Sequence, residues 1–146
     1  MSYKIISKFI KDISFEIPNI QAFVLLEKEL PKYSLNFDIK SKPYKDKIIE
    51  INTILKITPP QDIKHKILAE INLCALVSIE ENFMNYEQFE PNEKEELEKI
   101  ILIKVPKEIY PTLYKTFVYL FEQAGIKNVQ IHKEVDFEKM YKERKK

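Results

Sequence analysis

The first half of the chain alternates apolar and polar side chains with a period of two, and this pattern constrains the fold more than any other feature. The alternation runs through residues 3–17, 33–40, 47–58 and 64–79. In residues 3–17 the apolar side chains stand mostly at odd positions, and Ile6 and Ile10 are the exceptions. Because successive side chains of a strand point to opposite faces of a sheet, we predict four strands with one face against a core and one in water.

The links between the last three of these segments are short and polar. Pro43 and Asp46 separate the second from the third, and Pro59, Pro60 and Asp62 separate the third from the fourth. Short links join antiparallel neighbours, because a parallel return needs about a dozen residues or more. The longer stretch of residues 18–31 shows no stable period, and we predict a crossover loop that carries the apolar Phe23, Leu25, Leu26 and Leu30.

The second half has helical spacing. Residues 93–104 predict one helix, Val105 and Pro106 are expected to break it, and residues 107–124 predict a longer one that ends at Gly125. Residues 128–132 are expected to be extended, and Asp136 to be the N-cap of a final helix with Phe137, Met140 and Tyr141. The predicted fold is α+β, a four-stranded antiparallel sheet followed by helices packed on one face, in a single domain of residues 1–146.

The longer helix has two apolar stripes. One stripe holds Leu113, Phe117, Leu120, Phe121 and Ala124, and the other holds Tyr110, Tyr114, Val118 and Phe121. We expect one side of the helix to cover the sheet and the other to contact another subunit. The predicted oligomer interface consists of Tyr110, Tyr114, Phe117, Val118 and Phe121.

Composition excludes several functional classes. The chain has 146 residues and a single glycine, whereas a glycine-rich phosphate loop needs two or three in a short window. The formal net charge is +1, so the whole molecule is not suited to a strongly charged partner such as nucleic acid. The single cysteine, the absence of a signal-like start and the lack of a long apolar run lead us to expect a cytoplasmic protein.

A catalytic centre finds no support in the sequence. His65 and His132 lack neighbours at metal-ligand spacing, so we predict no metal and no cofactor. Cys74 has no basic sequence neighbour to activate it and is expected to be a packing residue. We therefore predict that the protein is not an enzyme. The apolar crossover and the second stripe of the long helix leave two interpretations open: a partner or peptide site, or packing onto the chain's own core together with an oligomer interface.

Four motifs, in order along the chain, resemble the SecB family of protein-export chaperones. Residues 10–19 read IKDISFEIPN, and residues 68–71 and 77–80 read LAEI and VSIE. Val105-Pro106 with Ile109-Tyr110-Pro111 is similar to the start of the family's long helix, and residues 135–137 to the approach to its last helix. Together these motifs cover nearly the whole chain.

The resemblance implies a function and a set of partners. It implies a cytosolic homotetramer, a dimer of dimers, that holds unfolded precursor proteins without ATP and delivers them to the SecA motor. It implies neither a cofactor nor insertion into a membrane. Clients would lie in apolar grooves between the crossover, the sheet edge and the last helix, and the candidate lining residues are Phe23, Leu26, Leu30, Tyr33, Phe137 and Met140.

The resemblance also implies a docking site for SecA on the polar face of the sheet. The family's positions fall here on Asp12, Glu16, Leu68 and Glu70. All four numbers are even, so periodicity independently places them on the polar face of the first and fourth strands. If these strands are neighbours, three carboxylates cluster where a basic partner could dock.

Two departures from the family pattern keep alternatives open. The end of the chain is basic where the family's tail is acidic, and glycines usual in the fourth strand are absent near Cys74 and Ala75. One alternative is a SecB-like chaperone that protects the antitoxin of a toxin–antitoxin pair. Others are a non-catalytic adaptor oligomer of the same fold and, least favoured, an enzyme with an unrecognised carboxylate site.

Overall fold

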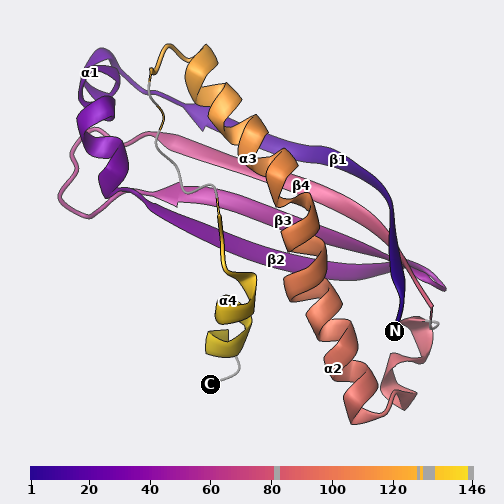
Figure 1. Cartoon of the computed structure of the whole chain (residues 1–146). Coiled ribbons are helices and arrows are strands. Elements are labelled where there is room, and N and C mark those ends of the chain that lie inside the picture. Colours follow the sequence, from indigo (N-terminus) through magenta and orange to yellow (C-terminus); the bar gives the residue numbers. More distant parts are fainter. Residues whose placement is uncertain (81–82, 128, 130–133, 145–146) are drawn as a thin grey trace.

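The computed structural model describes residues 1–80, 83–127, 129 and 134–144, and it arranges them as a sheet with helices on one face (Figure 1). The strands are β1 (Tyr3–Glu16), β2 (Ser34–Lys45), β3 (Ile48–Thr58) and β4 (Leu68–Ile79). The α-helices are α1 (Ile20–Glu29), α2 (Pro91–Lys99), α3 (Val105–Gln123) and α4 (Phe137–Arg144). Three short helical segments complete the fold: η1 (Leu30–Lys32), η2 (Phe83–Gln88) and the π-helical η3 (Ile100–Lys104).

The four strands form one antiparallel sheet in the order β1-β4-β3-β2. Both short links join neighbouring strands, as predicted, and the crossover carries the chain from β1 at one edge to β2 at the other. This arrangement confirms the predicted α+β class, and it makes the first and fourth strands neighbours, which is the condition for the carboxylates of these strands to cluster. It leaves β1 and β2 as the two edges of the sheet.

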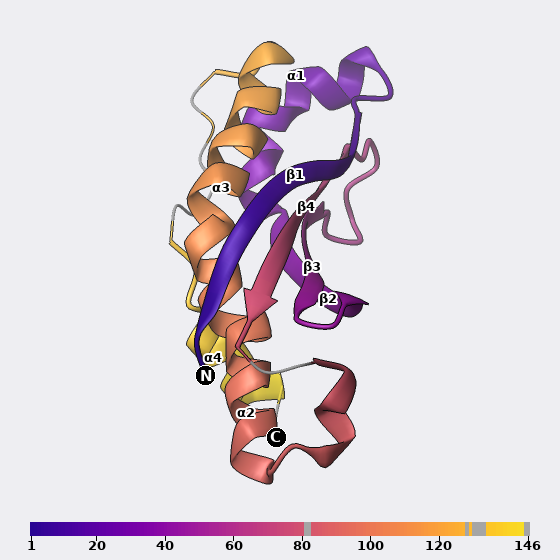
Figure 2. The same cartoon turned by 90° about the vertical axis from the view of Figure 1, so that its right-hand side faces the viewer.

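The helices α2, α3 and α4 lie on the same side of the sheet, and α1 lies at one end of it (Figure 2). Odd-numbered side chains of β3 and β4 form the sheet's half of the core. They pack with α3, and the largest fully buried side chains include Ile51, Leu55, Ile71, Phe117 and Phe121. We call the opposite side of the sheet, which none of these helices covers, the open face.

Two register shifts interrupt β1. At the first shift, Ile5 pairs with Val77 and Ser7 with Leu76, so Ile6 has no partner in β4. At the second shift, Ile10 pairs with Leu73 and Asp12 with Asn72, so Lys11 has no partner in β4. Between these two bulges the side chains change faces, because one extra residue reverses the alternation. Lys8 accordingly points to the helices and its Nζ donates to Thr112 Oγ1 of α3 at 2.9 Å. The bulges therefore account for Ile6 and Ile10 as exceptions to the sequence pattern.

The prediction of a crossover loop was wrong, because residues 20–29 form the helix α1. Asn19 caps it: its Oδ1 accepts a hydrogen bond from the backbone N–H of Ala22 at 2.9 Å. Ala22, Leu26 and Leu30 are buried at a spacing of four, which is the spacing of one helix face. The sequence pattern obscured this face because apolar residues also occur on the exposed side.

The predicted break at Val105 and Pro106 was also wrong. The helix α2, the π-helical η3 and α3 follow one another without interruption and cross the sheet obliquely as one rod (Figure 1). In the π segment, the N–H of Val105 bonds to the carbonyl of Ile100, five residues back. Pro106 follows directly as the second residue of α3, so the change from π-helical to α-helical bonding coincides with the proline that was expected to break the helix.

The ends of the last elements agree with the predictions that can be examined. Gly125 follows α3 with φ +97°, a conformation that favours glycine. Asp136 caps α4, because its Oδ1 accepts from the N–H of Lys139 at 3.0 Å. The predicted extended segment at residues 128–132 lies, apart from Val129, outside the described residues, and so does His132. Strand β2 runs beyond its predicted end at residue 40, and a register shift directly follows Pro43 in this edge strand.

Candidate functional site

The four residues predicted to contact SecA lie together on the open face. Between β1 and β4, Glu16 pairs with Leu68, and Ser14, two residues before Glu16, pairs with Glu70. Asp12 lies a further two residues before Ser14 in β1, on the same face. Asp12, Glu16 and Glu70 are therefore neighbours on one surface, and Leu68, which is 40% exposed, lies beside them. We call these four residues the acidic patch.

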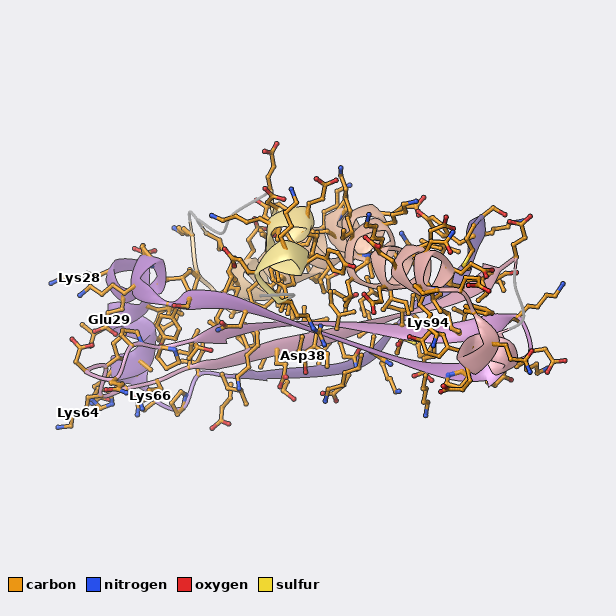
Figure 3. All side chains as sticks on the ribbon, turned by 90° about the horizontal axis from the view of Figure 1, so that it is seen from below. Lys28, Glu29, Asp38, Lys64, Lys66 and Lys94 are labelled. Atoms are coloured by element: carbon orange, nitrogen blue, oxygen red, sulfur yellow. The ribbon has the colours of Figure 1, made fainter. Side chains whose placement is uncertain are left out.

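The acidic patch is available to a partner. Ser14 Oγ lies 3.4 Å from Asp12 Oδ2, and among the described residues no salt bridge within 4 Å involves Asp12, Glu16 or Glu70. Figure 3 views the sheet from one side, with the helices above it and the side chains of the open face projecting below. Clustered carboxylates that are not engaged in salt bridges can accept charge-assisted hydrogen bonds from lysine or arginine of a partner.

Glu50 of β3 is the centre of a second charged group on the open face. Its Oε1 lies 2.6 Å from Lys11 Nζ and accepts from Asn52 Nδ2 at 3.1 Å, and its Oε2 lies 3.8 Å from Lys42 Nζ. The hydrogen bond from Lys11 is the main cause of a lowered pKa for Glu50, and that from Asn52 is the next. This group therefore keeps its carboxylate ionised and joins β1, β2 and β3 across the open face.

A separate groove of about 750 Å³ lies at the β2 edge of the sheet, on the side of the helices. Its apolar lining consists of Ile39, Tyr86, Leu97, Ile101, Leu102 and Tyr141. Lys40, Ser41, Glu98 and Arg144 add polar groups, and the Tyr141 hydroxyl donates to Glu98 Oε2 at 3.1 Å. Because β2 is an edge strand, an extended apolar segment could lie in this groove next to unpaired backbone groups.

The structure separates the six residues predicted to line a client groove. Leu26, Leu30 and Phe137 are buried in the chain's own core. Phe23 is 41% exposed, and its ring lies against Gly125 at the end of α3. A Cβ atom added at Gly125 would lie 3.5 Å from this ring. Tyr33 and Met140 are half-buried. None of the six lines the groove of about 750 Å³, although Met140 precedes the groove residue Tyr141 on α4.

The sequence did not identify the residues that line this groove. Ile39 lay in the clearest alternating segment, and Leu97 and Ile101 lay four apart in a predicted helix. These spacings mark burial, but they do not distinguish a core residue from a groove residue. Tyr86 lies in η2, a short helix for which the sequence has no periodic signal.

The predicted oligomer interface also divides. Tyr110, Phe117 and Phe121 are buried within the chain, where Phe117 and Phe121 contact each other edge to face at 5.3 Å between ring centres. Tyr114 and Val118 are only half-buried, and the neighbouring Tyr119 is exposed. Within this set, Tyr114 and Val118 therefore have the most surface left for another subunit.

The described residues contain no group of three or more His, Cys, Asp or Glu side chains that could hold a metal ion. His65 is half-buried near the start of β4, and its Nδ1 lies 3.4 Å from Asn19 Nδ2. Cys74 is fully buried, and burial, with Glu50 as the next cause, raises the pKa of its thiol to about 11. None of the helices in the described part of the chain combines the length and the hydropathy needed to cross a membrane.

Comparisons with known proteins agree over the whole chain. The family profile described as preprotein translocase subunit SecB matches residues 1–146. The putative protein-export protein SecB of Pelagibacter ubique is 38% identical over 143 residues, which are 98% of this chain and 96% of that protein. The protein-export protein SecB of Rhodospirillum rubrum is 26% identical over 94% of this chain and 78% of its own length. The protein-export protein SecB of Anaplasma phagocytophilum is 25% identical over 92% of this chain and 87% of its own length.

Proposed function

The chain belongs to the SecB family, and from this membership we propose that it is an ATP-independent holdase chaperone of protein export. In this proposal it binds unfolded precursor proteins in the cytoplasm and delivers them to the SecA motor. The names of its relatives, which are protein-export proteins, favour export over service to an antitoxin. No step of this function requires chemistry at a catalytic centre.

The observation that carries delivery to SecA is the acidic patch on the open face. Three carboxylates, Asp12, Glu16 and Glu70, lie on one surface of β1 and β4 although nothing in the core requires them there. The exposed Leu68 adds an apolar contact at the same place. A basic surface of SecA would meet opposite charge and one apolar side chain, a combination that guides association and fixes how the two proteins are aligned.

The groove at the β2 edge is the best candidate for client binding. Its lining is mostly apolar and aromatic, and the edge strand beside it offers backbone donors and acceptors. Unfolded segments expose both apolar side chains and unpaired backbone, so such a surface fits many sequences. Phe23 on α1, together with Tyr33 and Met140, would extend the contact surface beyond the groove.

We further propose that the protein works as a homotetramer. The edge of β1 carries the exposed apolar side chains Ile6, Phe9, Ile10 and Ile13. A long edge with unpaired backbone and apolar side chains is suited to pairing with a second copy. The partly exposed Tyr114 and Val118 on α3 supply a second surface, as two contacts are needed for a dimer of dimers.

The experiment that tests delivery measures SecA binding by titration calorimetry. We expect Asp12→Ala and Glu70→Ala each to weaken binding by about fivefold, since each removes one charge from a rim-type contact. Asp38→Ala is the matched control, because Asp38 is an exposed carboxylate on β2 that pairs with Lys40 at 3.6 Å (Figure 3). Unchanged affinity in both patch variants, or an equal loss in the control, would contradict the docking site.

A further inference from the structure

The bulge at Lys11 decides which face the acidic side chains of β1 occupy. After the bulge, Asp12 lies opposite Asn72 and Glu16 opposite Leu68, both on the open face. If Lys11 were paired in the ladder that precedes it, Asp12 would lie opposite Ile71 instead. Ile71 is fully buried under the helices, so Asp12 and Glu16 would then point into the core.

The side chain of Lys11 is anchored two strands away. Its Nζ lies 2.6 Å from Oε1 of Glu50 on β3, and β4 lies between β1 and β3. Lys11 therefore reaches across β4 on the open face, over the region of the buried Cys74. A contact this short between charged groups is a strong hydrogen bond, and it ties the unpaired residue of the bulge to the centre of the sheet.

The acceptor itself is held from two further sides. Asn52 Nδ2 donates to the same Oε1 at 3.1 Å, and Lys42 of the edge strand β2 lies 3.8 Å from the other oxygen. The Glu50 side chain is 14% exposed, so its position is more restricted than that of a surface carboxylate. A fixed acceptor favours one position of Lys11 and thus one position of the bulge.

We propose that Lys11 and Glu50 are positioning residues for partner docking: their ion pair holds the bulge, and the bulge keeps Asp12 and Glu16 on the open face beside Glu70. This inference rests on the proposed docking of SecA at the acidic patch. It adds two residues that lie outside the patch, one of which has the opposite charge to it. Lys11 acts on the partner through the register of β1, not by contact.

Charge alone predicts the opposite result from positioning. Removal of the Lys11 ammonium makes the open face more negative, which by itself strengthens the attraction of a basic partner. Loss of the anchor frees the bulge, which disperses the three carboxylates and weakens binding. The direction of the change in affinity therefore separates the two explanations.

The test compares Lys11→Met with Lys56→Met. Lys56 pairs with Glu70 in the ladder of β3 and β4, so the control removes the same charge from the same face without touching the bulge. Two quantities are measured: SecA affinity by calorimetry, and the nuclear Overhauser contact between the methyl groups of Ile13 and Ile71, which lie opposite each other in the present register. The methyl contact reports the register whether or not SecA binds.

We expect Lys11→Met to weaken the methyl contact and to lower SecA affinity by about fivefold, and Lys56→Met to leave the contact intact and the affinity equal or higher. Lys11→Arg keeps a cationic donor for the Glu50 carboxylate and should retain the methyl contact. An intact contact in Lys11→Met overturns the role of the ion pair in register. A lost contact with unchanged affinity overturns the link from register to docking, and failure of the wild-type chain to bind SecA overturns the docking site itself.

Discussion

Cys74 illustrates how a residue on the uncovered face of a sheet can be inaccessible to solvent. It lies between Phe9 of β1 and Asn52 of β3 in the register of the sheet, and its exposure is 0%. Its thiol, with a pKa of about 11, stays protonated near neutral pH, because ionisation would place a charge in a buried site next to Glu50. The sequence-based expectation of a packing residue agrees with this environment.

At the scale of single residues, we predict that groove side chains determine holdase activity. Leu102→Ser should raise the concentration needed to suppress aggregation of a denatured model protein by about fivefold, because it removes apolar contact area from the groove at the β2 edge. Ile103→Ser is the control, since Ile103 is also half-buried in η3 but lines a different hollow near Lys107 and Glu138. The readout is light scattering during dilution from denaturant.

Two outcomes would contradict this assignment. Equal losses in both variants would mean that the effect comes from destabilised helices and not from the groove. Aggregation at the unassisted rate with the wild-type chain would refute holdase activity as such and would favour a non-catalytic adaptor.

The shared face of the four residues of the acidic patch could be predicted from sequence, whereas the residues that line the groove could not. Asp12, Glu16, Leu68 and Glu70 share even numbers, and two bulges that cancel each other restored the alternation before Asp12. Had β1 contained only one bulge, parity would have placed Asp12 and Glu16 on the wrong face. The groove, in contrast, is formed by η2, α2, η3, α4 and β2, and no local pattern encodes how such separate segments meet.

At the scale of elements, α1 shows how a helix can be mistaken for an apolar loop. Its buried face is Ala22, Leu26 and Leu30, whereas Ile20 and Val24 are 77% and 66% exposed. Because apolar residues occur on both sides of the helix, the sequence does not show the spacing of four that marks its buried face. The N-cap Asn19 and the flanking prolines at positions 18 and 31 were the available signals for a helix between them.

We predict that α1 depends on its N-cap. Asn19→Ala should lower the free energy of unfolding by about 1 kcal/mol, because the N–H of Ala22 loses its acceptor. Asn19→Asp keeps an acceptor at the cap and should stay within about 0.5 kcal/mol of wild type. Urea unfolding followed by circular dichroism measures both. If the two variants are equally destabilised, the contact of Asn19 Nδ2 with His65 matters more than the cap.

At the scale of the whole molecule, the two edges of the sheet are chemically different. The β1 edge carries Ile6, Phe9, Ile10 and Ile13 in exposed positions, and the hairpin that ends β2 carries Tyr44 between lysines. Lysines and a proline on an edge discourage pairing with another sheet, whereas an apolar edge favours it. The β1 edge is therefore suited to pairing with a second copy of the chain, whereas the β2 edge is suited to staying unpaired.

We predict an oligomer that depends on the β1 edge. Multi-angle light scattering should give a mass of about four protomers of 17.5 kDa for the wild type. Ile6→Lys should shift the mass to a smaller species by placing a charge in the interface, while Tyr44→Lys, at a similarly exposed site, should leave it unchanged. A wild-type mass of one protomer would refute the tetramer, and equal behaviour of the two variants would exclude the β1 edge from the interface.

The order β1-β4-β3-β2 has a consequence for synthesis. Of the four strands, β1 is made before the others and pairs within the sheet only with β4, so Tyr3 must wait until Ile79 has emerged before it finds its partner. During that interval the hairpin of β2 and β3 can already form, because its contacts are local in sequence. The newly made chain thus carries β1 unpaired while β2 and β3 are made, and it passes through the exposed state that we propose it recognises in other proteins.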